Sequence, residues 1–236
     1  MKKILFFLFL LLLIGCTVNV NNTPQQKTIS VQGNSEFTTS PDEVKLYIRI
    51  ETKATTPKQA QDMNRERSNT VIAALKNNGF AEENIKSTQY NLQKQEHWDP
   101  DTQRIVATGY LLIHVIEATS KDIDNAGKVA DLVIDAGATG VDSVQFTLSE
   151  EKKKTSNEEA LKKAIENARE KANTIAKSLD ISLGKAEFVS ESNVYYSPRY
   201  YGRVEYAKAT TDAMPTEIQP NDVTVSAQVS VSFGIS

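Results

Sequence analysis

The stretch SNEEALKKAIENAREKANTIAKSL, residues 156–179, is the clearest element of the sequence. Its apolar residues recur at intervals of three and four, which places them on one face of a helix. Ser156 and Glu159 form a capping box, so we expect the helix to begin after Ser156. The members of this face are Leu161, Ala164, Ile165, Ala168, Ala172, Ile175, Ala176 and Leu179. The alanines among them indicate that the helix packs close to a sheet.

Alternating segments predict the strands of such a sheet. Residues 223–233 alternate over their whole length, with valines and Phe233 on one face. Residues 29–33 and 44–50 also alternate, and Ser40-Pro41-Asp42 between them is a turn signal, so we expect these two segments to form a hairpin. The other predicted strands are residues 85–95, 105–117, 141–148 and 185–194.

Two further helices are predicted. Thr56 can cap the first, Pro57 suits its first position and Gln59 completes a capping box, and residues 77–79 end it. Ser120 can cap the second, which residues 137–140 close.

A short internal repeat links the two helices. Residues 85–92 follow the first helix and residues 141–148 follow the second, and the two segments share Ser, Gln and Leu at matching positions, with an aromatic residue between. The pattern predicts an α+β fold of two related sheet-and-helix halves, with mainly antiparallel strands and three helices.

The N-terminus contains the only cysteine of the 236 residues. Lys2 and Lys3 precede an apolar run, residues 4–14, which is typical of a signal peptide and too short for a membrane span. Leu-Ile-Gly-Cys16 at its end resembles the lipobox of bacterial lipoproteins, in which the peptidase cuts before a cysteine that carries diacylglycerol. We therefore expect a signal peptide over 1–15, a lipidated Cys16 with a polar tether over 16–27, and a folded domain over 28–236. An ordinary signal peptide and an uncleaved anchor are the alternatives.

Charge and cysteine content narrow the function. Removal of residues 1–15 leaves 25 basic and 30 acidic residues, a net charge near −5, and no basic stripe stands out, so we expect no nucleic-acid partner. Lipidation of Cys16 would leave no thiol for a disulfide, a nucleophile or a metal site.

No sequence motif indicates catalysis. The chain has no Gly-rich phosphate loop, no Gly-x-Ser-x-Gly and no His-Glu-x-x-His. We interpret His114 as a half-buried strand residue on the face of Leu112 and Ile116, and His97 as part of a hairpin turn. Asn64 is expected to bond a neighbouring backbone group. We expect no catalytic residue, no metal and no cofactor.

A tyrosine-rich segment is the candidate interface. It contains Tyr195, Tyr196, Arg199, Tyr200, Tyr201, Arg203 and Tyr206. Tyrosine and arginine are enriched at interface hot spots because they bury area and keep a polar tip. A loop folded over its own sheet and a platform for stacked sugars or bases are the alternatives.

Residues 28–236 resemble the SIMPL-domain family of secreted or periplasmic proteins. The resemblance rests on the order and spacing of several segments: Val31-Gln-Gly33, Ser40-Pro-Asp-Glu-Val44, Asn64, residues 85–92, Gly109-Tyr110, residues 137–148, Ala160 to Ala172 and residues 223–233. It implies an α+β fold and no established enzymatic activity. Some members are linked to oxidative or envelope stress, and one periplasmic immunogenic member resembles a ring-shaped oligomer. The lipobox and Gln32 depart from the family pattern.

The sequence therefore predicts a lipid-anchored extracytoplasmic protein, periplasmic or at the cell surface, that is not an enzyme. Its expected partners are the membrane, through the lipid on Cys16, and either further copies of itself or an envelope protein. The alternative is an envelope ligand-binding protein or hydrolase whose site is built from scattered carboxylates and tyrosines.

Overall fold

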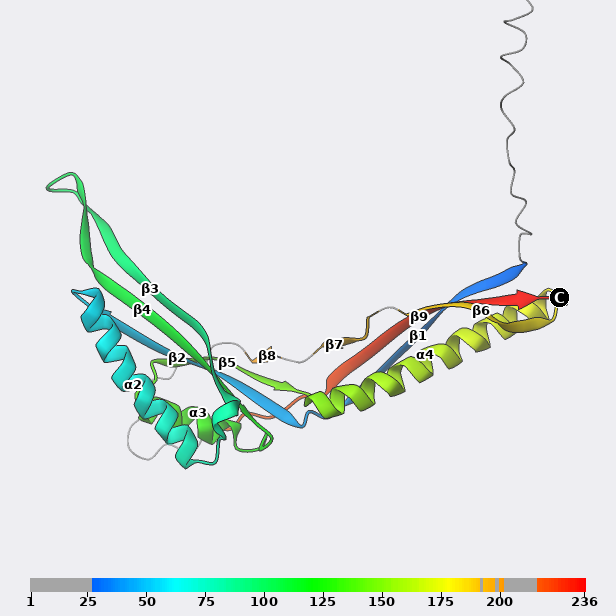
Figure 1. The fold of residues 1–236 in the computed structure, drawn as a ribbon, viewed down its shortest axis with the longest axis horizontal. Helices are drawn as coiled ribbons and strands as arrows, with labels where there is room; N and C mark the ends of the chain where they lie inside the picture. The colour runs from blue at the N-terminus through cyan, green and yellow to red at the C-terminus, as the bar shows by residue number, and fades with distance from the viewer. Residues whose placement is uncertain (1–26, 192, 198–199, 202–215) are drawn as a thin grey trace, which may run out of the picture.

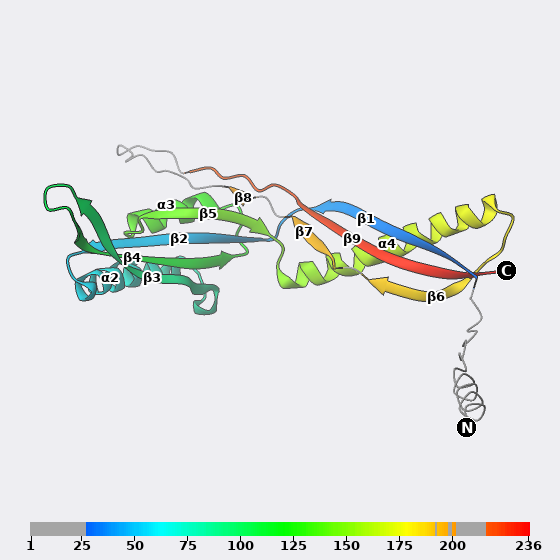
Figure 2. The ribbon, with the colours of Figure 1, turned by 90° about the horizontal axis from the view of Figure 1, so that it is seen from above.

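The computed structural model describes residues 27–191, 193–197, 200–201 and 216–236, with residues 200–201 described by their backbone only. Two sheets, each with helical cover on one face, follow one another along an elongated molecule (Figures 1 and 2). The strands pair antiparallel and three α-helices lie in the described part of the chain. The α+β fold class is confirmed.

The first half contains a sheet of order β1-β9-β6, with β7 also beside β9. Its strands are β1 (Thr28–Thr39), β6 (Leu183–Glu191), β7 (Tyr195–Ser197) and β9 (Val223–Ile235). The long helix α4 (Glu150–Ser178) covers one face. The alternating residues of β9 that the sequence singled out are buried under this helix.

Helix α4 packs on this sheet through alanines spaced four residues apart. Ala160, Ala164, Ala168, Ala172 and Ala176 are all buried. Gly33 on β1 lies beneath them, and a Cβ there would come within 1.9 Å of the Ala164 carbonyl oxygen. The predicted close approach of helix and sheet is therefore confirmed.

Two details of the predicted helix are wrong. The helix begins at Glu150, because Ser149 is its N-cap and accepts a hydrogen bond from the Lys152 N–H at 3.3 Å, whereas Ser156 is buried inside the helix. The apolar face is also narrower than the spacing suggested, since Ile165 and Leu179 are largely exposed. Only alanines fit where the helix approaches the sheet most closely.

The second half contains a sheet of order β3-β4-β2-β5-β8. Its strands are β2 (Glu43–Ala54), β3 (Ile85–Asp99), β4 (Arg104–Ser120), β5 (Gly140–Thr147) and β8 (Tyr200–Tyr201). Helices α2 (Pro57–Asn77) and α3 (Ala126–Asp135) cover one face, and a short 3₁₀ helix, η2 (Glu82–Asn84), precedes β3. The buried residues of β2, namely Val44, Leu46, Ile48 and Ile50, form the centre of the core.

The helix boundaries agree in part with the sequence. Thr56 caps α2 by accepting a hydrogen bond from the Gln59 N–H at 3.3 Å, as expected. Helix α3 begins later than expected, with Asn125 as its N-cap, because the Ser120 hydroxyl accepts from the Asp122 N–H within a turn instead.

The predicted hairpin of β1 and β2 is wrong. Strand β1 pairs with β9, and β2 pairs with β4 and β5, so the chain passes from one half to the other at residues 40–42. The two repeated segments lie in β3 and β5, both in the second half. Alternation shows that a strand has one buried face but does not show which strand is its neighbour.

Candidate functional site around His114

A β-bulge in β3 brings two polar residues to the same side of the second sheet. Ser87 lies opposite Ile116, but Tyr90 rather than Gln89 lies opposite His114, because Thr88 is inserted between them. Since side chains alternate along a regular strand, residues three apart face the same way only across such an insertion. Ser87 and Tyr90 therefore both lie beside His114.

The imidazole of His114 is enclosed by α2 and β3. Its Nδ1 lies 2.9 Å from the Ser68 Oγ and 3.2 Å from the Asn64 Oδ1, both on α2. Its Nε2 lies 2.7 Å from the Ser87 Oγ, and the Tyr90 ring meets the imidazole edge-on at 5.3 Å between centroids. His114 is only 8% exposed and shares its face with Leu112 and Ile116, as the sequence predicted, although it is more buried than expected.

The hydrogen bonds of Asn64 fix the tautomer of the histidine. The Asn64 Nδ2 donates to the Ile50 carbonyl at 3.0 Å, which confirms the expected backbone contact and leaves Oδ1 as an acceptor. The Ser68 hydroxyl donates to this oxygen at 3.2 Å. His114 must therefore carry its proton on Nδ1, and its Nε2 accepts the hydrogen bond of the Ser87 hydroxyl.

Burial determines the charge of the cluster. Desolvation lowers the pKa of His114 below its usual 6.5. The described contacts place hydroxyls, an amide and an aromatic ring around it. The imidazole is thus neutral at neutral pH.

A hollow of about 600 Å³ opens beside this cluster, between α2 and β3. His114, Ser68, Asn64 and Tyr90 line its inner part. At its rim the Asp62 carboxylate pairs with two cations of the same helix, with Lys58 at 2.9 Å and with Arg65 at 2.9 Å. Asp62 therefore neutralises one of these two positive charges, and the three side chains together keep a net charge of +1.

The chemistry available to this cluster is limited. The order Ser87, His114, Asn64 would let the imidazole accept the serine proton, as in nucleophilic hydrolases. The neutral Asn64 amide orients the ring but supplies no negative charge for the imidazolium that would form. Sequence analysis missed the cluster, because nothing in residues 85–90 indicates a bulge.

The structure describes part of the tyrosine-rich segment. The Tyr196 hydroxyl donates to the Lys153 carbonyl at 2.9 Å, and its ring packs against the core under α4. Tyr195 is 61% exposed. The backbone of Tyr200 and Tyr201 pairs with β5 in the other sheet, whereas Arg199, Arg203 and Tyr206 lie outside the described residues, as does Cys16.

The predicted hairpin turn is present, but it lies at residues 100–103, and His97 belongs to strand β3, where it pairs with Val106. The chain turns between β3 and β4, where the Asp99 carboxylate accepts from the Asp101 N–H at 2.9 Å and from the Thr102 hydroxyl at 2.8 Å.

In the described ranges no group of three or more His, Cys, Asp or Glu side chains is placed to hold a metal ion. Within the same ranges no helix is both long and apolar enough to cross a membrane.

The fold and cluster define an elongated α+β protein with one helix-covered sheet in each half. The SIMPL family model, described as a protein of unknown function (DUF541), matches residues 29–233, and the chain belongs to this family. It is 25% identical over 214 residues to the 26 kDa periplasmic immunogenic protein of Brucella melitensis, which covers 88% of this chain and 85% of the relative. It is 24% identical over 231 residues to the uncharacterized protein YggE of Escherichia coli K12, which covers 98% and 92%.

Proposed function

We propose that this protein is a lipid-anchored extracytoplasmic assembly protein and not an enzyme. Cys16 would carry the lipid, residues 17–27 would form the tether, and the folded part would associate with further copies of the chain. The periplasmic name of the Brucella relative supports the compartment. A role in envelope or oxidative stress defence completes the proposal and rests on the SIMPL resemblance alone.

The assembly proposal is carried by a projecting hairpin, here called the arm and formed by residues 95–109. Strand β2 ends its pairing with β4 at Ala54 and Tyr110, and beyond this point β3 and β4 continue as a two-stranded ribbon (Figure 1). A lone two-stranded hairpin is only marginally stable in water. The arm therefore gains stability if it packs against another surface.

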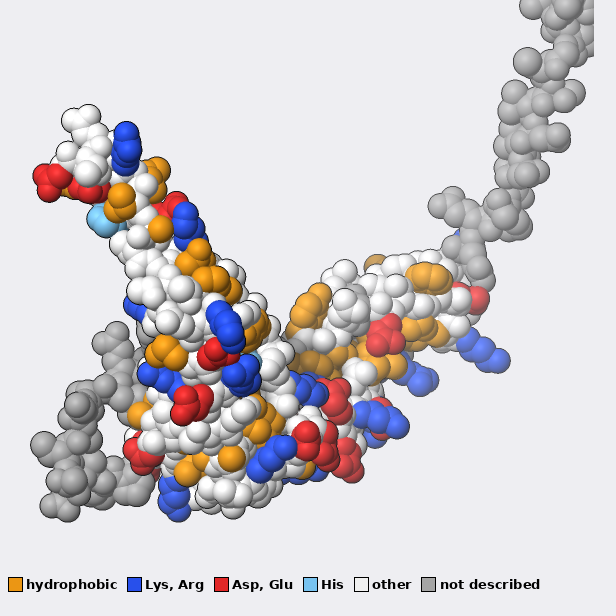
Figure 3. All heavy atoms as spheres, turned by 60° about the vertical axis from the view of Figure 1, so that its left-hand side comes forward, with side chains coloured by type: hydrophobic (Ala, Val, Ile, Leu, Met, Phe, Trp, Pro, Cys, Tyr) orange, Lys and Arg blue, Asp and Glu red, His pale blue; other side chains and the backbone are white. Residues whose placement is uncertain are grey.

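The arm also exposes large apolar side chains. Trp98 and Ile105 lie opposite each other near its tip and are 59% and 67% exposed. Figure 3 shows hydrophobic side chains along this hairpin as it leaves the body of the molecule. Burial of such a pair stabilises a contact by about 25 cal/mol per Å² of apolar area, and aromatic residues are enriched in interfaces.

The tyrosine-rich segment supplies the second part of the proposed interface. Tyr200, Tyr201, Arg199, Arg203 and Tyr206 remain its candidate residues. Their position next to β5 at the edge of the second sheet supports this assignment for the two tyrosines. Tyr196 is not part of this surface, because its ring packs against the core under α4.

The rival function is an envelope hydrolase or ligand-binding protein. The observation that favours it is the 2.7 Å contact between Ser87 and His114 beside the hollow on α2. The hydrogen bonds of Asn64, Ser68 and His114 within the protein support a structural role for the cluster.

Sedimentation velocity of the full chain, extracted from membranes in mild detergent, tests assembly. We expect an oligomer whose mass falls in the variant Trp98→Ala/Ile105→Ser. The control is Ile165→Ser, which alters an apolar residue of α4 that is also exposed. Self-assembly through the arm is wrong if the wild-type protein is a monomer across micromolar concentrations or if the control dissociates equally.

A further inference from the structure

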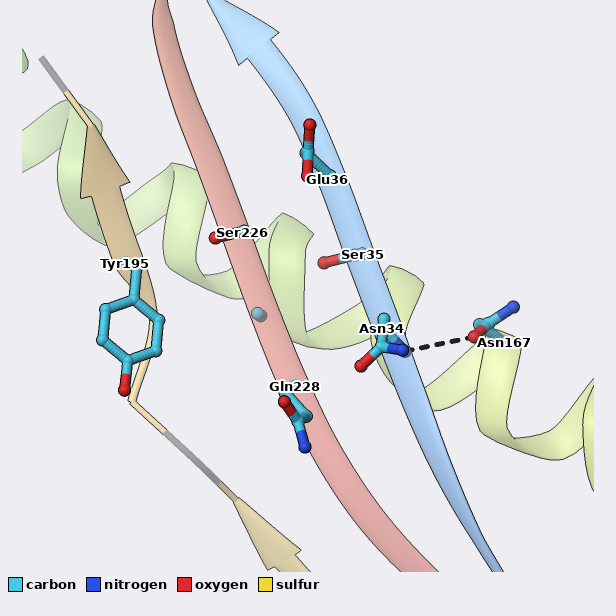
Figure 4. Close-up of a pocket in the computed structure, with 8 residues that line it drawn as sticks. Asn34, Ser35, Glu36, Asn167, Tyr195, Ser226 and Gln228 are labelled. Carbon is cyan, nitrogen blue, oxygen red and sulfur yellow. Dashed lines mark hydrogen bonds between the residues drawn. The ribbon is translucent and has the colours of Figure 1, made fainter.

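Among the described residues, no helix or strand covers the face of the first sheet that lies opposite α4. On β9 the buried valines alternate with Thr224, Ser226, Gln228, Ser230 and Ser232, which therefore face the other way. On β1 the outward residues are Thr38, Glu36, Asn34, Gln32 and Ser30, and each lies directly opposite one of the five in that order. Figure 4 looks onto this face, with α4 behind the strands.

The side chains of this face, here called the polar ladder, are almost all uncharged. They carry hydroxyl or amide groups, and Glu36 is the single ionisable side chain among the ten. Ser30 and Ser232 bond each other across the strands at 2.7 Å. Asn34, Glu36, Ser226 and Gln228 line a shallow hollow of about 470 Å³.

Two exposed aromatic rings stand beside the polar ladder on the far side of β9. Tyr195 on β7 lies opposite Ser226 and lines the same hollow, and Phe188 on β6 lies opposite Ser232. They are 61% and 62% exposed. Cross-strand partners share a face, so both rings lie on the ladder side of the sheet. Their partners lie six positions apart on β9, roughly 20 Å along the strand.

We propose that this face binds an extended, neutral, β-linked polysaccharide chain. Such a chain presents hydroxyl groups at its edges and C–H groups on its ring faces. The hydroxyl and amide groups of the ladder can both donate and accept hydrogen bonds, as hydroxyls require. Tyr195 and Phe188 supply apolar platforms for the ring faces. The spacing of the two rings fits a ligand several sugar units long.

Other occupants fit this face less well. A nucleic acid needs Lys or Arg against its phosphates, and the ladder contains neither. A second copy of the chain would bury serines, which are depleted in protein interfaces. The ladder and the arm lie in different halves of the molecule, so glycan binding and assembly can fail separately.

Isothermal titration calorimetry of the detergent-extracted full chain with chitohexaose and with cellohexaose tests the proposal. The two probes distinguish an N-acetylated glycan from a plain glucan. We expect binding of at least one, weakened about tenfold by Tyr195→Ala or by Phe188→Ala, which corresponds to about 1.4 kcal/mol for each ring. Gln228→Ala should also weaken binding, because it removes hydrogen bonds without touching either ring.

Trp98→Ala is the matched control, because it removes a ring of similar exposure from the arm. The affinity per chain should stay unchanged in this variant even if the oligomer dissociates. Circular dichroism must show that each variant remains folded. The proposal is overturned if neither oligosaccharide binds, if the Tyr195→Ala/Phe188→Ala variant binds as well as wild type, or if this variant changes only the sedimenting mass.

Discussion

The carboxylate of Asp42 binds Ser149 twice. Its Oδ1 accepts a hydrogen bond from the Ser149 N–H at 2.8 Å, and its Oδ2 accepts one from the Ser149 hydroxyl at 2.6 Å. Asp42 lies at the junction of the two sheets, and Ser149 caps the helix that covers the first sheet. Lys152 adds a bond from its Nζ to the Ser40 carbonyl at 2.6 Å. The Asp42 side chain thus connects residues 40–42, where the chain passes from one sheet to the other, to the start of α4.

We predict that Asp42→Ala destabilises this junction. Burial alone would raise the pKa of Asp42, but the hydrogen bonds from Ser149 and the charge of Lys152 outweigh it, so the pKa falls below 3.8. The stabilisation is present above pH 3.8 and is lost as pH falls through the lower pKa of the folded state. The variant should lose about 1.5–3 kcal/mol of unfolding free energy at neutral pH, measured by urea denaturation. Asp101→Ala, in the turn of the arm, is the control, and equal losses in the two variants would contradict the prediction.

A second prediction concerns the close packing of α4. Gly33→Ala would place a Cβ within 1.9 Å of the Ala164 carbonyl oxygen and 2.7 Å of the Ala168 Cβ, so helix and sheet must separate. We expect a loss of about 1–3 kcal/mol or more in unfolding free energy, since overpacking forces backbone shifts. Gly140→Ala is the control, because no atom lies within 4 Å of its added Cβ. An unchanged thermal midpoint for Gly33→Ala would show that α4 packs further from β1.

Sequence periodicity predicted where helices and strands lie but not which strands pair with each other. The stripe of alanines predicted the contact between α4 and a sheet, and Thr56-Pro57 placed the start of α2. Strands β1 and β2 are consecutive and both alternate, yet β1 pairs with β9 at the other end of the chain. The pairing depends on contacts between residues about two hundred positions apart, and a local sequence pattern contains no information about them.

The candidate site was harder to predict than the fold. Asn64, Ser68, Ser87 and His114 lie on three elements, and no local sequence pattern connects them. The bulge at Thr88 decides whether Ser87 or its neighbour reaches the imidazole. The arm was predicted as a turn with a strand from residue 105 onward, because the polar residues near Trp98 do not indicate that β3 continues to Asp99.

We predict that His114 makes stability depend on pH. Its pKa in the folded protein lies below the unfolded value of 6.5 because of burial, so the unfolded state binds protons first. The unfolding free energy should be full above pH 6.5 and should decrease from there down to the lower pKa of the folded state. His114→Gln should remove this decrease in a pH series of urea denaturation. His97→Gln alters the other histidine, and loss of the pH dependence in that variant instead would exclude His114 as its source.

Lipidation of Cys16 is predicted from the lipobox. Intact-mass analysis of the membrane-extracted protein should show a chain that begins at Cys16 and carries acyl groups. Several acyl chains on one residue would hold the protein firmly, since a single chain binds membranes only weakly. Cys16→Ser should either leave the membrane fraction or remain uncleaved. An unmodified mass for the wild-type chain would refute the anchor.

The last prediction separates a scaffold from a hydrolase at the His114 cluster. Transfer of the Ser87 proton to Nε2 would create an imidazolium that is buried and faces a neutral amide, and burial already lowers the pKa of this histidine. Ser87 should therefore not react with a fluorophosphonate probe, as measured by the intact mass of the treated protein. Ser87→Ala should instead lower the unfolding free energy by about 1 kcal/mol, because the Nε2 of His114 loses its partner. Labelling that disappears in Ser87→Ala and weakens in His114→Gln would show an activated serine, and the non-enzymatic proposal would then be wrong.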